Sequence, residues 1–164
     1  MRKVVFAFVF LVVAASCKDS SKTENRLSDY QQVLNSSVLY SNITGRLTEV
    51  MTYDIFSPPV ASRIYAYAHL AAYETMAKGD SSYISLAGQL KDLTEIPKPD
   101  SIGLIDFPYA SLIPLMEVGR TLTFSKDQTD RIVDSIKNLA KDHGMPEAMK
   151  RKSEAYGISV ANAV

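Results

Sequence analysis

From residue 29 onward the apolar residues recur at helical spacing, and no segment alternates apolar and polar residues as a half-buried strand would. A first helical segment is expected over residues 29–54. Asn42 and Gly45 are poor helix formers and divide this segment into two pieces. Its apolar side is expected to consist of Val33, Leu39, Leu47, Val50 and Met51.

The next segment, residues 57–78, is expected to be a helix in the middle of a bundle. Ser57 can cap its start, prolines are tolerated in a first turn, and Gly79 can end it. Apolar residues occur on nearly every side of this helix. Its many alanines also allow neighbouring helices to approach closely.

Residues 80–103 are expected to be irregular, with a short helix around residues 83–90. A helix over residues 106–122 follows, with Pro114 as a kink or break. A Ser125-x-x-Gln128 capping box then begins an amphipathic helix that ends at Gly144. A last helix starts at Pro146-Glu147 with an apolar stripe along Met149, Tyr156 and Val160. These patterns predict an all-α helical bundle.

The first 28 residues have a different character. Residues 1–16 combine a short basic start, an apolar run and small residues, as in a signal peptide. Cys17, the single cysteine, follows directly, in a pattern that resembles the lipobox of bacterial lipoproteins. The alternative is a chance cysteine at an ordinary secretory cleavage site. We expect lipid attachment at Cys17, a polar lipidated tether over residues 17–28, and a helical domain over residues 29–164.

This organisation predicts a protein of the bacterial cell envelope, periplasmic or surface-exposed, held to a membrane by its lipid. Eighteen basic and eighteen acidic side chains balance, and no basic stripe occurs, so a nucleic-acid partner is not expected. A single cysteine excludes a disulfide within the chain. Glu49, Asp54 and Glu74 lack histidine partners at metal-binding spacing, and His143 fits a structural role at a helix C-terminus.

Several stretches together resemble one known family. They read LTEVMTYDIFSPPVASRIYAYAHLAAYE, SLAGQL, FPYASLIPLMEVGRTLTFS and MPEAMKRKSEAYGISVA, within residues 45–164. They are similar to a bacterial branch of the vanadium-dependent haloperoxidases, within the type 2 phosphatidic acid phosphatase superfamily. The resemblance implies an all-α bundle. It also implies an oxyanion site for vanadate or phosphate, used either for peroxide-dependent halide oxidation or for phosphate ester hydrolysis.

The family builds its oxyanion site from three motifs: Lys-x6-Arg-Pro, Pro-Ser-Gly-His and Ser-Arg-x5-His-x3-Asp. This chain contains no Arg-Pro and no Gly-His dipeptide. Ser62-Arg63-x5-His69 matches most of the third motif, but Tyr73 stands at the place of its aspartate. On a continuous helix Arg63 and His69 point about 120° apart. No residue is therefore expected to be catalytic.

We interpret His69 instead as a packing residue, together with Tyr65, Tyr67 and Tyr73, whose polar tips would be hydrogen-bonded. Arg63 is expected to cap a neighbouring helix or to pair with Asp54 or Glu74.

The sequence thus predicts the N-terminal helices of a membrane-anchored haloperoxidase-like or acid phosphatase-like enzyme, with an incomplete last helix and an exposed apolar stripe. No cofactor is expected in this chain, whereas vanadate is expected in the full-length protein. The expected partners are the membrane and either the remainder of the bundle or a second copy. The alternative is a non-enzymatic envelope lipoprotein that serves as a helical binding or scaffolding module.

Overall fold

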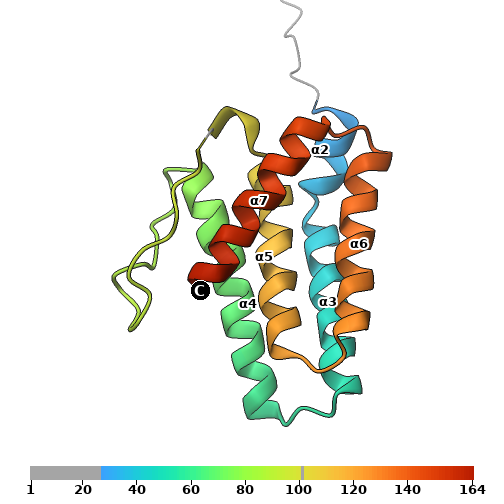
Figure 1. The fold of residues 1–164 in the computed structure, drawn as a ribbon, viewed down its shortest axis with the longest axis vertical. Coiled ribbons are helices and arrows are strands. Elements are labelled where there is room, and N and C mark those ends of the chain that lie inside the picture. The colour runs from blue at the N-terminus through green and yellow to red at the C-terminus, as the bar shows by residue number, and fades with distance from the viewer. Residues whose placement is uncertain (1–26, 101) are drawn as a thin grey trace, which may run out of the picture.

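The computed structural model describes residues 27–100 and 102–164, which form six α-helices, one 3-10 turn and no strand. The fold is all-α, as predicted (Figure 1). Residues 1–26, which include the predicted signal peptide, Cys17 and most of the tether, lie outside the described residues. The elements are α2 (Asp29–Leu34), α3 (Ser37–Tyr53), α4 (Pro58–Gly79), η2 (Ile102–Leu104), α5 (Phe107–Leu122), α6 (Lys126–Asp142) and α7 (Glu147–Ala163).

Helix α5 is the centre of the bundle, and the prediction that residues 57–78 form the central helix is wrong. Helices α3, α4, α6 and α7 all contact α5 (Figure 1). α5 is buried along most of its length, whereas α4 exposes Arg63, Ala66 and Tyr67 to solvent. The difference is one of side-chain size: α5 supplies large aliphatic side chains, whereas the apolar residues of α4 are mostly alanines, which bury little area wherever they lie.

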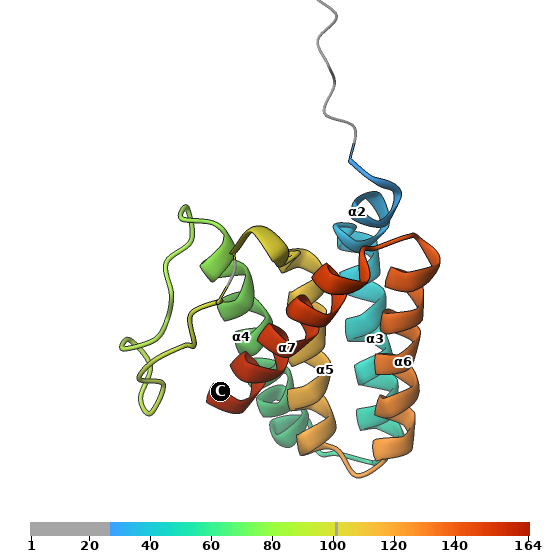
Figure 2. The same cartoon turned by 45° about the horizontal axis from the view of Figure 1, so that its top comes forward.

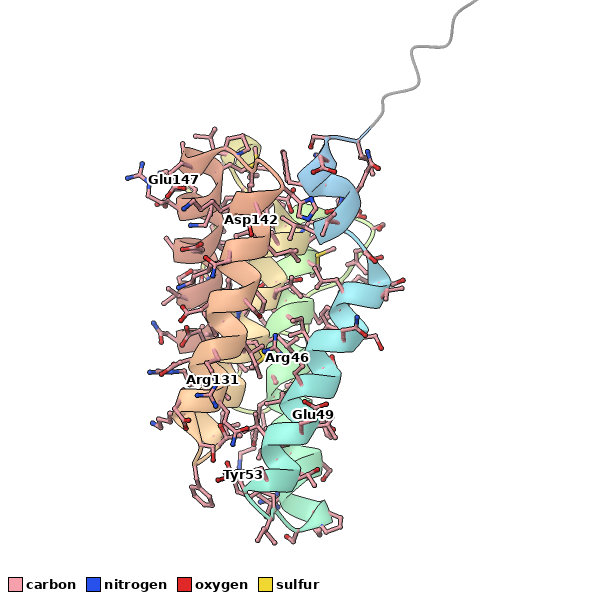
Figure 3. All side chains as sticks on the ribbon, turned by 90° about the vertical axis from the view of Figure 1, so that its right-hand side faces the viewer. Arg46, Glu49, Tyr53, Arg131, Asp142 and Glu147 are labelled. Carbon is pink, nitrogen blue, oxygen red and sulfur yellow. The ribbon has the colours of Figure 1, made fainter. Side chains whose placement is uncertain are left out.

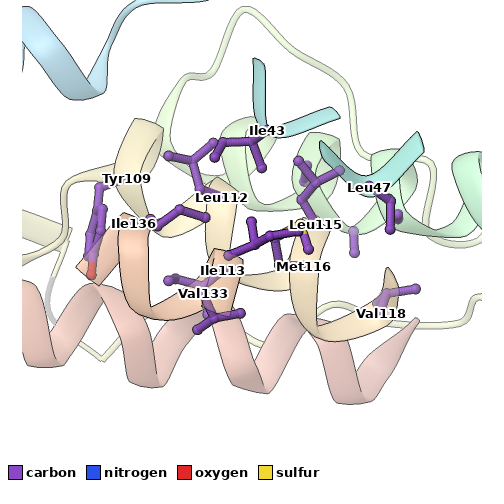
Figure 4. Close-up of a cluster of buried hydrophobic side chains, with 14 of the residues drawn as sticks. Ile43, Leu47, Tyr109, Leu112, Ile113, Leu115, Met116, Val118, Val133 and Ile136 are labelled. Carbon is purple, nitrogen blue, oxygen red and sulfur yellow. The ribbon is translucent and has the colours of Figure 1, made fainter. Parts of the chain in front are cut away.

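The main core is formed where α3, α4, α5 and α6 meet, and Figure 4 shows part of it. Leu112, Leu115 and Met116 of α5 are at most 1% exposed and pack between neighbouring helices. The amphipathic pattern of α6 is confirmed, since Ile132, Val133, Ile136 and Ala140 are buried. The outer faces of α3 and α6 carry charged side chains, among them Glu49 and Arg131 (Figure 3). Within the described residues no helix is long and apolar enough to cross a membrane.

Helix α7 lies across α5 in close contact, and it ends near α4 (Figures 1 and 2). A Cβ atom added to Gly157 would come within 2.7 Å of the Ala110 carbonyl oxygen and 3.0 Å of Pro114 Cδ. Pro114 lies inside a continuous α5, and it has no N–H to donate to that carbonyl four residues earlier. Because Gly157 has no side chain, α7 can approach α5 closely at the turn that contains Ala110 and Pro114.

This close approach buries the stripe of α7. Tyr156 is 6% exposed and Val160 is fully buried, so the predicted exposed stripe through Met149, Tyr156 and Val160 is wrong for these two residues. Ser153 Oγ accepts a hydrogen bond from the Asp106 N–H at 3.0 Å, and Asp106 Oδ1 in turn caps α5 by accepting from the Tyr109 N–H at 3.0 Å. Helix α7 thereby fixes the N-terminal end of α5.

Two local predictions are wrong in position. The break in the first helical segment falls at Asn35-Ser36, between α2 and α3, and α3 runs unbroken through Asn42 and Gly45. Residues 80–100 contain turns but no helix around residues 83–90. Here buried Leu93 and Ile96 attach the segment to the bundle, so tertiary contacts replace local helix formation.

The predicted capping box at Ser125 is also replaced by a tertiary contact. Ser125 Oγ donates to Asp54, the C-cap residue of α3, and Asp54 Oδ2 accepts from the Phe124 N–H at 2.7 Å. A further bond comes from the Ser125 N–H at 3.1 Å. Desolvation raises the pKa of Asp54, but these hydrogen bonds outweigh it and hold the pKa below its usual value. One carboxylate thus links the end of α3 to the start of α6.

The first prediction concerns the crossing of α5 and α7. Gly157→Ala should lower the free energy of unfolding by about 1–3 kcal/mol, because the new methyl group meets the Ala110 carbonyl oxygen, Ile113 Cβ and the ring of Pro114, none of which is the far end of a flexible side chain. Gly45→Ala is the matched control, since nothing lies within 4 Å of its added Cβ. It should stabilise α3 by about 0.5–1 kcal/mol. Urea denaturation of both variants measures these changes, and equal stabilisation by the two would contradict the close crossing.

The second prediction concerns Asp54. Because its pKa is lower in the folded than in the unfolded chain, the carboxylate stabilises the fold above the unfolded-state value of about 4. This contribution disappears as the pH falls through the folded-state pKa. Asp54→Ala should therefore cost about 1 kcal/mol at neutral pH, as for a lost helix cap, and progressively less in acid.

Urea denaturation between pH 7 and pH 3 measures this dependence. Glu49→Ala is the control for Asp54, because Glu49 is an exposed acid of the same helix without a hydrogen bond or ion pair to any described residue. A pH-independent cost at Asp54 would contradict the assigned role.

Candidate functional site around His69

The residues that match the oxyanion motif are dispersed around α4. Ser62 is exposed, and its Oγ donates to the Pro59 carbonyl oxygen at 2.8 Å within its own helix. Arg63 is exposed and makes no ion pair or hydrogen bond with any described residue, so its predicted pairing with Asp54 or Glu74 is wrong. His69 lies six residues further along the helix, which is less than two turns, and is half-buried. The structure therefore does not bring Arg63 and His69 together.

His69 is held instead by Tyr40 from α3. The Tyr40 hydroxyl lies 2.7 Å from His69 Nδ1, and the ring of Tyr65 stacks on the imidazole with a centroid distance of 6.1 Å. Tyr65 is in turn hydrogen-bonded through its hydroxyl to Thr48. Burial lowers the pKa of His69 and raises the pKa of Tyr40 to about 12, so both groups are neutral near pH 7. The site is an uncharged imidazole–phenol pair.

The prediction that His69 packs among tyrosines is confirmed for Tyr65, but the partners differ in detail. Tyr67 is 48% exposed and does not contribute to this group. Tyr73 donates from its hydroxyl to the Ile84 carbonyl oxygen at 2.8 Å. Sequence reasoning missed Tyr40, which lies 29 positions before His69 and shares no motif with it. No local signal connects the two, because only the packing of α3 on the bundle brings them together.

A cavity of about 360 Å³ lies beside this pair. It is bounded by the α2–α3 junction, the C-terminal half of α4 and the start of α5. Its floor includes the buried residues Leu34, Ala72 and Leu112. The cavity thus joins a concave, mostly apolar space to a titratable pair, which is the usual form of a small-molecule site.

The acidic candidates have structural partners. Glu74 is fully buried on α4 and accepts hydrogen bonds from Ser85 Oγ and from the Leu86 N–H, both at 2.6 Å. It thereby anchors the segment of residues 80–100. The oxygens of Asp54 likewise accept hydrogen bonds from backbone N–H groups at the start of α6. Both carboxylates are therefore already hydrogen-bonded to groups of the protein itself. In residues 27–100 and 102–164 no group of three or more His, Cys, Asp or Glu residues is placed to hold a metal ion.

His143 is the C-cap residue of α6, and its Nδ1 lies 2.7 Å from Asp29 Oδ2 in the first turn of α2. The contact joins the end of α6 to the start of α2, and His143 is not among the residues that line the cavity at His69. His143 is therefore not part of the candidate site around His69.

The cavity at His69 does not fit vanadate. An anion of that charge requires several convergent cationic donors, whereas none of the residues that line the cavity at His69 is Lys or Arg. A neutral imidazole bonded to a neutral phenol offers no compensating charge. No chemical step through vanadate can be derived from these residues.

No protein-family model matches the chain, and no curated protein matches it either. Among solved structures, the chain is similar to the first bacterial vanadium-dependent iodoperoxidase, with 43% sequence identity and a TM-score of 0.69. The match covers 76% of this chain and 29% of the iodoperoxidase, so the chain spans less than a third of that protein. The described helices thus form a helical unit that is similar to part of a vanadium-dependent haloperoxidase.

Proposed function

We propose that this chain supplies the N-terminal helices of a vanadium haloperoxidase-like enzyme of the type 2 phosphatidic acid phosphatase superfamily. The observation that carries the proposal is 43% identity to an iodoperoxidase over 76% of this chain, together with a TM-score of 0.69. The fold-level likeness alone would be weak support for a function. Identity at this level over so many positions is far stronger support.

In this proposal the oxyanion site lies outside the described helices. Two observations support it: the residues of the one partial motif are dispersed around α4, and the cavity at His69 is lined without a charged side chain. The helices act as a scaffold, in which α5 is the central element and α3, α4, α6 and α7 surround it. Their role is to fix the geometry of a site built by other residues.

The activity proposed for the whole protein is oxidation of halide by hydrogen peroxide, with phosphate ester hydrolysis as the related chemistry of the same superfamily. Both reactions need a tightly held oxyanion and a histidine that attacks or ligates it. Similarity to an iodoperoxidase favours halide oxidation. The halide or ester is not specified by any of the described residues.

The third prediction tests the absence of the site from these helices. The chain alone, supplied with vanadate, hydrogen peroxide and iodide or bromide, should form oxidised halogen no faster than the same mixture without the protein. Absorbance of triiodide or of a brominated indicator dye measures the rate. Vanadate-dependent turnover that is lost in Arg63→Ala or His69→Ala would contradict the proposal.

The coding DNA beyond codon 164 provides an independent check of the proposed enzyme. An open reading frame that encodes Arg-Pro and Pro-Ser-Gly-His motifs would support it. A frame without these motifs would favour the alternative, an envelope lipoprotein with a helical binding or scaffolding role and no enzymatic activity.

We also propose that the protein is anchored to a bacterial membrane through a lipid on Cys17. The support is the apolar run and small residues that precede this single cysteine.

The fourth prediction is that expression of the full chain in a bacterial host yields a product that begins at Cys17 with two or three acyl chains. Mass spectrometry of the N-terminus and partitioning into a detergent phase measure this. Cys17→Ala should abolish both the acyl mass and the partitioning. A wild-type product without an acyl mass would refute the anchor.

A further inference from the structure

The cavity beside His69 has the size of a small-ligand site. Its volume of about 360 Å³ falls at the lower end of the range for such sites, which is roughly 300–1,000 Å³. Buried Leu34, Ala72 and Leu112 give it an apolar floor, while exposed Asn35 and Ser37 lie at its rim. A molecule in solution can therefore reach the cavity and remove apolar surface from water on entering it.

The wall of the cavity is aromatic and fixed in position. Tyr73 and Tyr83 meet edge to face with a centroid distance of 6.3 Å. The hydroxyl of Tyr73 is already bonded to the Ile84 carbonyl oxygen at 2.8 Å, which holds this ring in place. A planar ring entering the cavity can thus meet another aromatic face or edge, a contact that adds to the effect of apolar burial.

The Tyr40–His69 pair is neutral, and the other polar side chains of the lining, which include Asn35, Ser36, Ser37 and Ser111, are uncharged as well. None of the residues that line the cavity is Asp, Glu, Lys or Arg. Burial lowers the pKa of His69 and raises that of Tyr40, so neither residue adds a charge near pH 7. An ionised ligand would lose its hydration without gaining a counter-charge. The cavity consequently selects against anions and cations alike.

The same pair can both donate and accept a hydrogen bond. When Tyr40 donates to His69 Nδ1, the other ring nitrogen, Nε2, carries the proton and is a donor, while the Tyr40 oxygen retains a lone pair. In the other tautomer Nε2 is an acceptor and the Tyr40 hydroxyl is a donor. The His69 Nε2 atom is not hydrogen-bonded to any residue within 27–100 or 102–164. A hydroxyl group, which is donor and acceptor at once, suits either state.

From these features we propose that the cavity at His69 binds a small neutral aromatic alcohol of the phenol class, with its hydroxyl at the Tyr40–His69 pair and its ring between the apolar floor and Tyr73. Such an alcohol is uncharged and carries an apolar ring, whereas an oxyanion is charged and has little apolar surface. This binding site does not depend on the proposed enzymatic function, because it uses only residues between α2 and α5 that the structure describes.

The fifth prediction tests this site with three ligands that share one ring: 4-methylphenol, toluene and 4-methylbenzoate. In the protein of residues 1–164, 4-methylphenol should shift the amide NMR signals of Leu34, Ala72 and Leu112 in a saturable manner. Toluene, which lacks the hydroxyl, should bind roughly three- to tenfold more weakly. The ionised 4-methylbenzoate should bind more weakly than both.

The variant Tyr40→Phe removes only the hydroxyl and separates the polar contact from the apolar one. It should weaken 4-methylphenol binding roughly three- to tenfold and leave toluene binding unchanged. Tyr67→Phe, on the exposed side of α4, is the matched control and should change neither affinity. Toluene binding to Tyr40→Phe also verifies that the cavity is intact in this variant. If Tyr40→Phe does not fold, the order of affinity of the three ligands for the wild-type protein decides whether the proposal holds.

Three results would overturn the proposal. The first is the absence of a saturable shift with 4-methylphenol. The second is equal affinity for 4-methylphenol and toluene. The third is preferential binding of 4-methylbenzoate, or displacement of 4-methylphenol by vanadate, since either would show that the cavity accepts anions. Halide oxidation by a longer protein would leave each of these outcomes unaffected, so this test and that of the proposed function fail independently.

Discussion

The close crossing of α7 over α5 is the contact on which the rest of the bundle depends. Pro114 leaves the Ala110 carbonyl oxygen without its intrahelical donor, and Gly157 removes the side chain that would collide with it. The approach allows Ser153 to accept a hydrogen bond from the N-cap residue of α5 and allows Glu154 to accept one from Tyr109 at 2.6 Å. Because the start of α5 also lines the cavity at His69, the crossing helps to position the candidate site.

Two carboxylates, those of Asp54 and Glu74, bind backbone and side-chain hydrogen-bond donors rather than cations. Asp54 joins α3 to α6, and Glu74 anchors the segment after α4. The cavity at His69 is left uncharged, and Arg63 remains on the surface. A pocket without cationic side chains accounts for the poor fit of the cavity at His69 to vanadate.

The sequence predicted the helices correctly where their apolar residues recur with a clear period. It predicted poorly those features that depend on contacts between residues far apart in the chain. The apolar face of α6 and the ends of α4 and α5 follow from local spacing and breakers. The role of Ser125 depends on a tertiary partner, Asp54. At the site, spacing along α4 correctly separated Arg63 from His69. It could not identify Tyr40, because that contact exists only once α3 packs against α4.

His69 belongs to a neutral pocket rather than to an oxyanion site, and an NMR pH titration of its imidazole, with and without vanadate, tests this claim most directly. We predict a pKa below the ordinary value of about 6.5 and an identical curve when vanadate is added. A pKa raised above that value in the presence of vanadate, with a matching shift of the ring signals, would contradict the claim.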